Sequence, residues 1–275
     1  MNARFLLLIF SILLMSLPAG AEENIAPPDL APLFREAAAE GTFVLYRVAD
    51  QTTHVHNPER AKTRFAPAST FKIVNAIIGL EAGSVANVDE ILPYGGQPQF
   101  LKSWEKDMSL RDGMPISNVP IFQELARRTG LERMQSWLTK LEYGNADAGQ
   151  VVDRFWLDGP LEISPLEQTQ FLARLAQKQL PIDEKTFQQV SDITVADRGP
   201  GWVLHAKTGM LLKEGAMNIG WWVGWIEKEG EIYTFALNMD LPEISDGGKR
   251  IPLARKCLAA LGVIPEPALP ESPAK

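Results

Sequence analysis

Residues 219–239 read IGWWVGWIEKEGEIYTFALNM and contain two runs rich in aromatic and branched residues. Such residues are typical of β-strands, and the two runs cover residues 219–227 and 231–239. Between them stands Glu229-Gly230, a pair typical of a tight turn. This stretch therefore predicts two neighbouring strands joined by a turn.

Further strands are expected on both sides of this hairpin and near the start of the chain. Residues 202–206 precede it, while residues 42–49 and a short run around His54 form a second candidate hairpin. Between residues 69 and about 175 the apolar side chains recur at helical spacing. This order predicts an α+β fold, an antiparallel sheet built from both termini, flanked by helices and with a helical region inserted.

The helices are expected at residues 29–40, 131–141, 164–178 and 249–261, the last ending at Gly262. One interdigitated domain over residues 22–264 is expected, rather than two domains in series. The Pro-rich residues 265–275 are expected to form a frayed tail.

The first 21 residues resemble an export signal. Arg4 precedes an apolar run over residues 5–17, and Ala19-Gly20-Ala21 offers small residues for cleavage. The run is shorter than the roughly 18 residues that span a bilayer, and no later run reaches that length. We expect an exported, periplasmic protein without membrane insertion after cleavage; an uncleaved anchor is the alternative.

Composition excludes several classes of function. The net charge of −7 argues against nucleic acid as a partner, because phosphate binding needs a basic surface. Cys257 is the single cysteine, so no intrachain disulfide can form. His54 and His56 would share one face of a strand, but no ligand cluster accompanies them, so we expect no metal.

Ser69-Thr70-Phe71-Lys72 opens the most regular helical pattern of the sequence. Residues at positions i and i+3 share a helix face, with β-carbons roughly 5 to 6 Å apart. The Lys72 amine can therefore reach the Ser69 hydroxyl. A helix start also leaves backbone N–H groups unpaired, which suits the stabilisation of an oxyanion.

The Ser-x-x-Lys pattern alone is weak evidence, because Ser103 and Ser272 also begin one, and Ser69 could be an ordinary helix cap. Two further motifs strengthen it. Ser117-Asn118-Val119 follows downstream, and Lys207-Thr208-Gly209 stands at the end of a predicted strand. This order is the signature of serine enzymes that react with penicillin.

Over residues 24–263 the sequence resembles the class D, oxacillinase-type serine β-lactamases. The resemblance also rests on four other segments, namely Tyr143-Gly144-Asn145, Phe155-Trp156-Leu157, Leu161-Glu162-Ile163-Ser164 and the run Gly220-Trp221-Trp222-Val223-Gly224-Trp225. Class A enzymes carry Ser-Asp-Asn where this chain has Ser-Asn-Val. Their hydrolytic Glu motif is also missing, since Glu162 and Glu167 stand in different local sequences.

The resemblance implies that Lys72 is carboxylated by carbon dioxide and serves as the general base. Only a neutral amine attacks carbon dioxide, so an apolar pocket must lower the pKa of the lysine. The expected pocket residues are Phe71, Val119, Trp156 and Leu157. The Trp156 indole N–H is expected to donate to the carbamate.

The remaining roles follow from the same resemblance. Ser117 is expected to pass a proton toward the lactam nitrogen, assisted by Lys207. The backbone N–H groups of Ser69 and Met210, the latter on an edge strand, are expected to form the oxyanion hole. Thr208 and Arg250 are expected to bind the substrate carboxylate. Tyr143-Gly144-Asn145 is expected to shape the site wall, and Trp221, Trp222 and Trp225 to pack.

The sequence therefore predicts a β-lactamase that hydrolyses penicillins of the oxacillin type through a Ser69 acyl-enzyme, with no cofactor beyond the carboxylated lysine. Two rivals remain open: a D,D-peptidase or transpeptidase, and a penicillin-sensing domain that is acylated without turnover. Deacylation separates them, and the sensor would need membrane helices. The loop over residues 210–218 gives no readable substrate preference, and the oligomeric state is equally unreadable.

Overall fold

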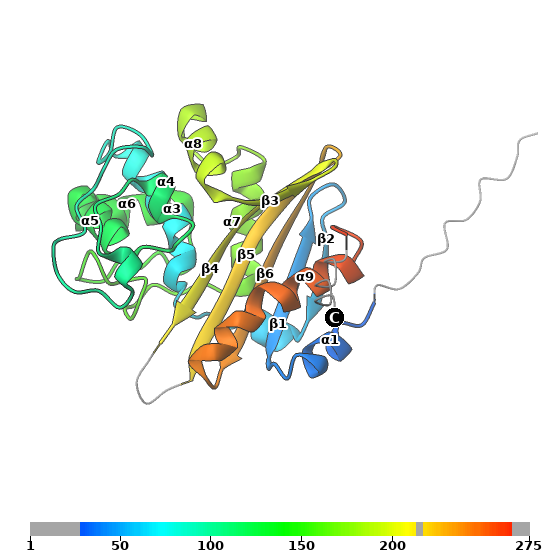
Figure 1. Ribbon diagram of the computed structural model, residues 1–275. Helices are drawn as coiled ribbons and strands as arrows, with labels where there is room; N and C mark the ends of the chain where they lie inside the picture. Colours follow the sequence, from blue (N-terminus) through cyan, green and yellow to red (C-terminus); the bar gives the residue numbers. More distant parts are fainter. Residues whose placement is uncertain (1–27, 213–216, 266–275) are drawn as a thin grey trace, which may run out of the picture.

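The computed structural model describes residues 28–212 and 217–265. Its centre is a six-stranded antiparallel sheet with the strand order β2-β1-β6-β5-β4-β3 (Figure 1). The strands are β1 (Gly41–Arg47), β2 (Thr52–His56), β3 (Val195–Gly199), β4 (Trp202–Leu211), β5 (Asn218–Lys228) and β6 (Glu231–Leu241). The two ends of the chain thus meet in one sheet, because β1 pairs with β6.

The β5–β6 hairpin is long because its turn suits the twist of the strands. Lys228 pairs with Glu231, and the two residues between them, Glu229 and Gly230, have φ of 51° and 85°. Positive φ at both central positions is the geometry that two-residue hairpins favour. Along β5 successive side chains face opposite sides of the sheet, so Trp221 belongs to one hydrophobic cluster and Trp222 to the other.

Helices cover both faces of the sheet (Figure 1). On one face α1 (Ala31–Glu36) and α9 (Arg250–Ala260) enclose a cluster that includes Trp222, Phe235 and Leu258. On the other face α7 (Pro165–Ala176) packs against β1, β5 and β6. The α7 helix begins with a capping box between Ser164 and Glu167.

The inserted helical region lies beside β4 (Figure 1). Its helices are α3 (Lys72–Glu81), α4 (Leu110–Gly113), α5 (Val119–Thr129), α6 (Leu131–Leu141) and α8 (Glu184–Thr194), with α2 (Pro58–Lys62) nearer to β1. Helix α3 contacts both α5 and α8, and residues 72–79 are all buried. It is therefore the central helix of this region.

The predicted fold class is confirmed, but several predicted elements differ. The helix expected over 29–40 is only Ala31–Glu36, because Ala38 takes a φ of 46° that a helix cannot continue. The strand expected over 42–49 ends at Arg47. Helix α8 and strand β3 were not expected, since the Val-Ala-Asp-Arg-Gly of β3 shows no clear apolar alternation.

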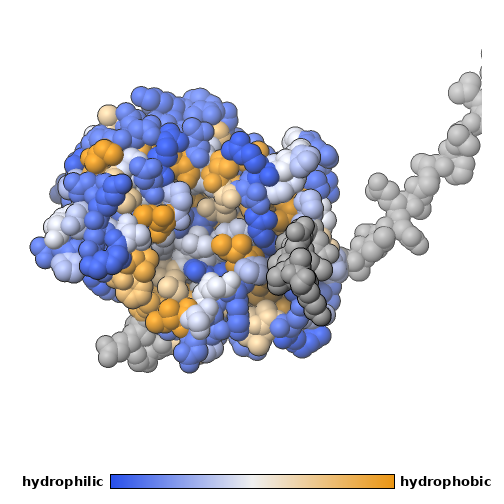
Figure 2. All heavy atoms as spheres, viewed as in Figure 1, coloured by the Kyte–Doolittle hydropathy of each residue, from blue (hydrophilic) through white to orange (hydrophobic). Residues whose placement is uncertain are grey.

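The expected signal peptide and the tail beyond Pro265 lie outside the described residues. Within the described part of the chain, no helix combines the length and the apolar character needed to cross a membrane. The face visible in Figure 2 is mostly hydrophilic, with separate smaller hydrophobic patches. Scattered apolar side chains of this kind are ordinary on a folded protein.

Candidate active site

Ser69 and Lys72 lie side by side where the helical region meets the sheet. Ser69 stands in a 3₁₀ turn, η1 (Ala68–Phe71), and Lys72 is the first residue of α3. The expected helix start at Ser69 is therefore corrected to a 3₁₀ turn that leads into the helix. The Lys72 Nζ lies 2.6 Å from the Ser69 Oγ, and the lysine is fully buried. A hydroxyl thus faces an amine that solvent does not reach.

The η1 turn is held in an uncommon conformation. Ala68 has a φ of 49°, which non-glycine residues rarely adopt. Two contacts fix it: the Ala68 N–H donates to the Trp156 carbonyl at 2.9 Å, and the Thr70 hydroxyl donates to the Pro67 carbonyl at 2.7 Å. Strain of this kind is concentrated at functional sites, and here it immediately precedes the candidate nucleophile.

The amine of Lys72 lies in apolar surroundings. Burial, and secondarily the positive charge of Lys207, hold the pKa of Lys72 well below its usual range. Phe71 stacks on Trp156 with 5.3 Å between ring centroids, and the Phe122 ring lies 5.5 Å from the Lys72 Nζ. Phe122 was not identified from the sequence, since α5 brings it here only through the tertiary fold.

Trp156 is completely buried, and its indole N–H has no hydrogen-bond partner among the described residues. A buried donor without an acceptor costs roughly 1 to 3 kcal/mol. Its ring stacks on Phe71, which directly precedes Lys72. The arrangement therefore provides a hydrogen-bond donor without a partner among the described residues, on a ring that stacks against the residue before Lys72.

Lys207 and Ser117 form a second polar pair across the cleft. Lys207, on β4, is 4% exposed, and its Nζ donates to the Ser117 Oγ at 3.0 Å and to the Thr208 carbonyl at 3.1 Å. Burial, with a smaller contribution from Arg250, lowers the pKa of Lys207 to about 7. Ser117 has a φ of 58°. The cleft thus holds a serine hydroxyl bonded to a buried lysine whose pKa lies near neutral pH.

Arg250 begins α9 and adds a second cation beside Lys207. Its guanidinium donates through Nε to the Gly247 carbonyl at 2.6 Å and through Nη1 to the Gly209 carbonyl at 2.5 Å. Burial lowers the pKa of Arg250, but an arginine so anchored remains charged. A Cβ at Gly220 would lie 2.9 Å from the Arg250 Cδ, so the glycine makes room for the side chain.

Gly209 allows β4 to approach the nucleophile turn. A Cβ there would lie 3.0 Å from both the Pro67 carbonyl oxygen and the Thr70 Cγ2. Strand β3 covers only residues 202–205 of β4, so residues 207–211 lie at the sheet edge next to η1, as expected for Met210. The close approach gives a physical reason for glycine in Lys-Thr-Gly.

These groups surround one cleft with a volume of about 380 Å³. Seven of the predicted site residues line it, namely Ser69, Ser117, Val119, Leu157, Thr208, Met210 and Arg250. Apolar side chains that include Phe100, Leu101 and Trp104 form most of the remaining wall, together with the charged Arg154 and Asp158. Lys72, Lys207, Phe71 and Trp156 lie buried beneath or beside this surface. The sequence motifs therefore converge in space.

The Tyr143-Gly144-Asn145 triplet does not form the wall of this cleft, contrary to expectation. Tyr143 is fully buried, and its hydroxyl accepts a hydrogen bond from the Gln168 Nε2 at 3.2 Å. The same Nε2 donates to the Thr70 Oγ1 at 3.0 Å. Tyr143 and Gln168 thus support the nucleophile turn from behind, and Gln168 was missed because no motif contains it.

The three tryptophans of β5 pack as expected. Trp221, Trp222 and Trp225 are each at most 2% exposed. Trp221 also donates to the Ala66 carbonyl at 3.0 Å. They support the sheet and the segment that leads to η1.

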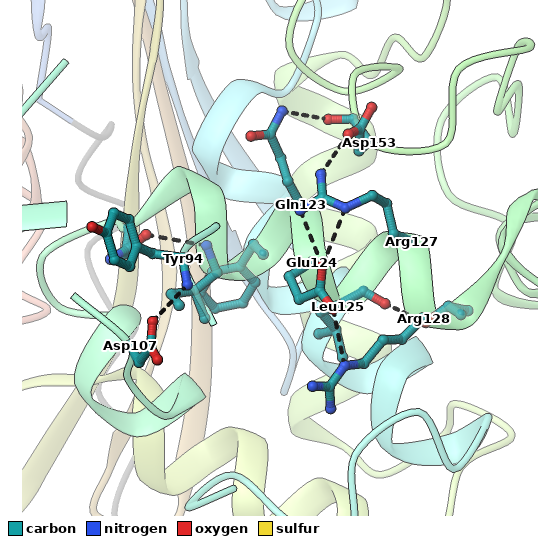
Figure 3. Close-up of polar contacts among 12 residues, drawn as sticks. Tyr94, Asp107, Gln123, Glu124, Leu125, Arg127, Arg128 and Asp153 are labelled. Atoms are coloured by element: carbon teal, nitrogen blue, oxygen red, sulfur yellow. Dashed lines mark hydrogen bonds and ion pairs between the residues drawn. The ribbon is translucent and has the colours of Figure 1, made fainter. Parts of the chain in front are cut away.

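Helix α5 holds Asp153, which leads along the chain to Trp156 (Figure 3 shows the Asp153 contacts). The Gln123 Nε2 donates to the Asp153 carbonyl at 2.9 Å, and the Arg127 guanidinium pairs with the Asp153 carboxylate at 2.6 Å. Glu124 in turn pairs with both Arg127 and Arg128. Asp153 precedes Trp156 by three residues, so α5 anchors the approach to the lysine pocket.

Comparisons with known proteins identify the family of this chain. A family model described as the penicillin binding protein transpeptidase domain matches residues 41–259. The β-lactamase OXA-5 of Pseudomonas aeruginosa is 39% identical over 233 residues, which cover 84% of this chain and 87% of OXA-5. The chain belongs to the class D β-lactamases.

Solved class D β-lactamases have the same architecture. FUS-1 (OXA-85) from Fusobacterium nucleatum subsp. polymorphum matches with a TM-score of 0.82 and 43% identity, covering 86% of this chain and 98% of that one. The class D enzyme YbXI from Nostoc matches with a TM-score of 0.83 and 38% identity, covering 86% and 99%. Within the described residues of this class D β-lactamase, no group of three or more His, Cys, Asp or Glu side chains could hold a metal ion.

Proposed function

We propose that this class D β-lactamase hydrolyses the cyclic amide of penicillins through an acyl-enzyme on Ser69. The 2.6 Å contact between the Ser69 Oγ and the buried Lys72 Nζ carries this proposal. The Oγ attacks the lactam carbonyl, a C–O bond forms, the C–N bond breaks and the lactam nitrogen takes a proton. Water then attacks the ester carbonyl, which releases Ser69 and the opened product.

The surroundings of Lys72 fit a carbamate, the product of its amine and carbon dioxide. A depressed pKa keeps the amine neutral, and the Trp156 N–H, which has no partner among the described residues, suits an anionic acceptor. When present, the carbamate supplies a base for the Ser69 hydroxyl and for water. Phe71 and Trp156 keep bulk water away from the amine, while Val119 and Leu157 line the cleft above it.

The residues around the cleft suit the other steps. Ser117, hydrogen-bonded to Lys207, is placed to pass a proton to the lactam nitrogen. The N–H groups of Ser69 and Met210, on η1 and on the free end of β4, would stabilise the oxyanion. Thr208 and Arg250 would hold the substrate carboxylate.

Three further points belong to this proposal: the substrate class, the side chain of the substrate and the location of the enzyme. The related OXA-5 and OXA-10 are named as β-lactamases, which supports a β-lactam substrate here. The apolar wall of the cleft suits a penicillin with a bulky, oxacillin-type side chain. Export to the periplasm through the signal-like residues 1–21 would bring the enzyme to such drugs.

The experiment is mass spectrometry of the protein during penicillin turnover, with and without bicarbonate. Wild type should show a transient adduct on Ser69 and faster release with bicarbonate. Ser69→Ala should form no adduct and lose turnover. Ser103→Ala, which alters another Ser-x-x-Lys pattern, should behave as wild type. Full turnover in Ser69→Ala would overturn the proposal, and an adduct stable for hours would indicate a peptidase or a sensor instead.

A further inference from the structure

Asn75 is a buried polar residue that the proposed mechanism does not yet use. It lies on α3, is fully buried, and donates through its Nδ2 to the Phe122 carbonyl at 2.9 Å. This bond fixes which end of the amide is the oxygen. The Oδ1 has no hydrogen-bond partner among the described residues. The amide therefore presents an unused acceptor inside the core.

This acceptor belongs to a residue on the same face of α3 as Lys72, and the two groups are not hydrogen-bonded while Lys72 is a free amine. The two residues stand at positions i and i+3 of the same helix, so their β-carbons are roughly 5 to 6 Å apart on one face. Both side chains also contact Phe122, Lys72 over the ring and Asn75 at the backbone carbonyl. The same three elements, namely α3, α5 and the Trp156 segment, thus hold one unpaired donor and one unpaired acceptor.

A carbamate on Lys72 would need both a hydrogen-bond donor and a hydrogen-bond acceptor. When the neutral amine adds carbon dioxide, an N–C bond forms, one C=O electron pair moves to oxygen, and one proton leaves the nitrogen. The product is an anion with two acceptor oxygens and one remaining N–H. Trp156 can donate to one oxygen and the Ser69 hydroxyl to the other, so the N–H still needs an acceptor.

We infer that the Asn75 Oδ1 is that acceptor and that Asn75 positions the carboxylated Lys72. This inference rests on the proposed carbamate. An asparagine suits the task because its amide oxygen accepts without charge. A carboxylate at the same place would repel the anion in a buried site. With Trp156 and Asn75 on different atoms of the planar group, its orientation toward Ser69 is fixed.

The test measures carbamate formation itself by ¹³C NMR with labelled bicarbonate, at a constant pH near 8. Asn75→Leu removes the amide at similar volume. It should raise the bicarbonate concentration for half-occupancy of Lys72 by roughly ten- to a hundredfold, the effect of leaving one buried donor unpaired. The matched control is Asn238→Leu. Asn238 is also fully buried with one unpaired amide atom, but it lies on β6 and accepts from Arg60.

The outcomes separate the inference from the function on which it rests. If Lys72 is carboxylated to the same extent in Asn75→Leu as in wild type and in Asn238→Leu, the role of Asn75 is overturned. The carbamate proposal itself would stand. No carbamate signal in wild type would overturn the carbamate proposal as well. Should Asn75→Leu fail to fold, the test uses NMR of wild-type protein labelled with ¹⁵Nζ-lysine, which measures how fast the carbamate N–H exchanges and which protons lie near it. A slowly exchanging carbamate N–H with a proton contact to the Asn75 amide supports the inference, and a rapidly exchanging one contradicts it.

Discussion

Lys72 is buried without a counter-ion among the described residues, its hydrogen-bond partner there being the neutral Ser69 hydroxyl, and Lys207, itself near Arg250, adds positive charge nearby. An ammonium group in such a place would lose most of its hydration, at a cost of several kcal/mol. Deprotonation removes that cost, and conversion to an anion would turn the neighbouring cations into favourable partners. The same burial that disfavours the cation would, under the proposed mechanism, make the amine reactive toward carbon dioxide.

Trp156→Phe tests the indole donor at the residue scale. The phenyl ring retains much of the stacking on Phe71, while the only polar atom of the side chain is lost. We expect half-maximal turnover to need roughly tenfold or more bicarbonate, since one charge-assisted hydrogen bond is missing. Turnover against bicarbonate concentration measures this. Trp137→Phe on α6 serves as the control, and equal curves for both variants would refute the expectation.

Lys207 predicts a pH dependence. With a pKa of about 7, the free enzyme carries a cation there below pH 7 and a neutral amine above it. The attraction for an anionic substrate, and hence kcat/KM, should fall as the pH rises through about 7. The kcat profile should fall at a higher pH, because a bound carboxylate raises the pKa of Lys207. Lys207→Arg should lack this descending limb, and its persistence in the variant would assign it to another group.

At the scale of elements, α7 matters beyond packing. Gln168 on this helix donates to both Thr70 and Tyr143, so it couples α7 to the η1 turn. Helix α5 performs a comparable task for the Trp156 segment through Asp153 (Figure 3). The Ala68 N–H then joins that segment to η1. Nucleophile and lysine pocket are therefore held by two helices that contribute no reacting atom.

Gln168→Met should show this coupling. The substitution keeps the length of the side chain but leaves the Thr70 and Tyr143 hydroxyls without their shared donor. We expect unfolding to become easier by about 1 to 3 kcal/mol, together with slower acylation and little change in bicarbonate requirement. Thermal denaturation and stopped-flow acylation measure the two effects. Gln177→Met, just beyond α7, is the control, because the Gln177 side chain donates to Ala173 of α7 and accepts from Gln179. Unaltered acylation in Gln168→Met would contradict the coupling.

At the scale of the whole molecule, the charges are unevenly arranged. The net charge is −7, yet Lys207 and Arg250 stand together at the cleft. An anionic substrate is therefore attracted locally and repelled by the molecule as a whole. At physiological ionic strength, salt largely screens interactions between exposed charges that are more than about 8 to 10 Å apart. The attraction by the cleft cations exceeds the repulsion by the rest of the protein at short range, because the bound substrate lies closer to these cations.

Salt should consequently raise KM. Between about 0.05 and 0.5 M NaCl, at constant bicarbonate, we expect a several-fold increase for a penicillin. Arg250→Gln should have a higher KM at low salt and a shallower salt dependence. Arg255→Gln, on the same helix but paired with Asp197, should retain the wild-type dependence. A KM that does not change with salt would contradict the attraction by the cleft.

The sequence predicts the sheet well because aromatic and branched runs mark its long strands, as β5 and β6 show. It also predicts the motif residues that the fold brings to one cleft. It does not reveal Phe122, Asn75 or Gln168, whose roles arise from contacts with residues elsewhere in the chain. Short polar β3 and the positive φ of Ala68 depend on tertiary packing in the same way.

The left-handed backbone conformation of Ser117, with a φ of 58°, restricts which residues are tolerated at that position. Threonine would also supply an alcohol, but its branched side chain is poorly tolerated at such a φ. Glycine would relax the chain and discard the alcohol altogether. Under the proposed role of Ser117, serine is therefore the residue that best combines an alcohol with this backbone, and a drug that contacts this group should meet few tolerated substitutions there.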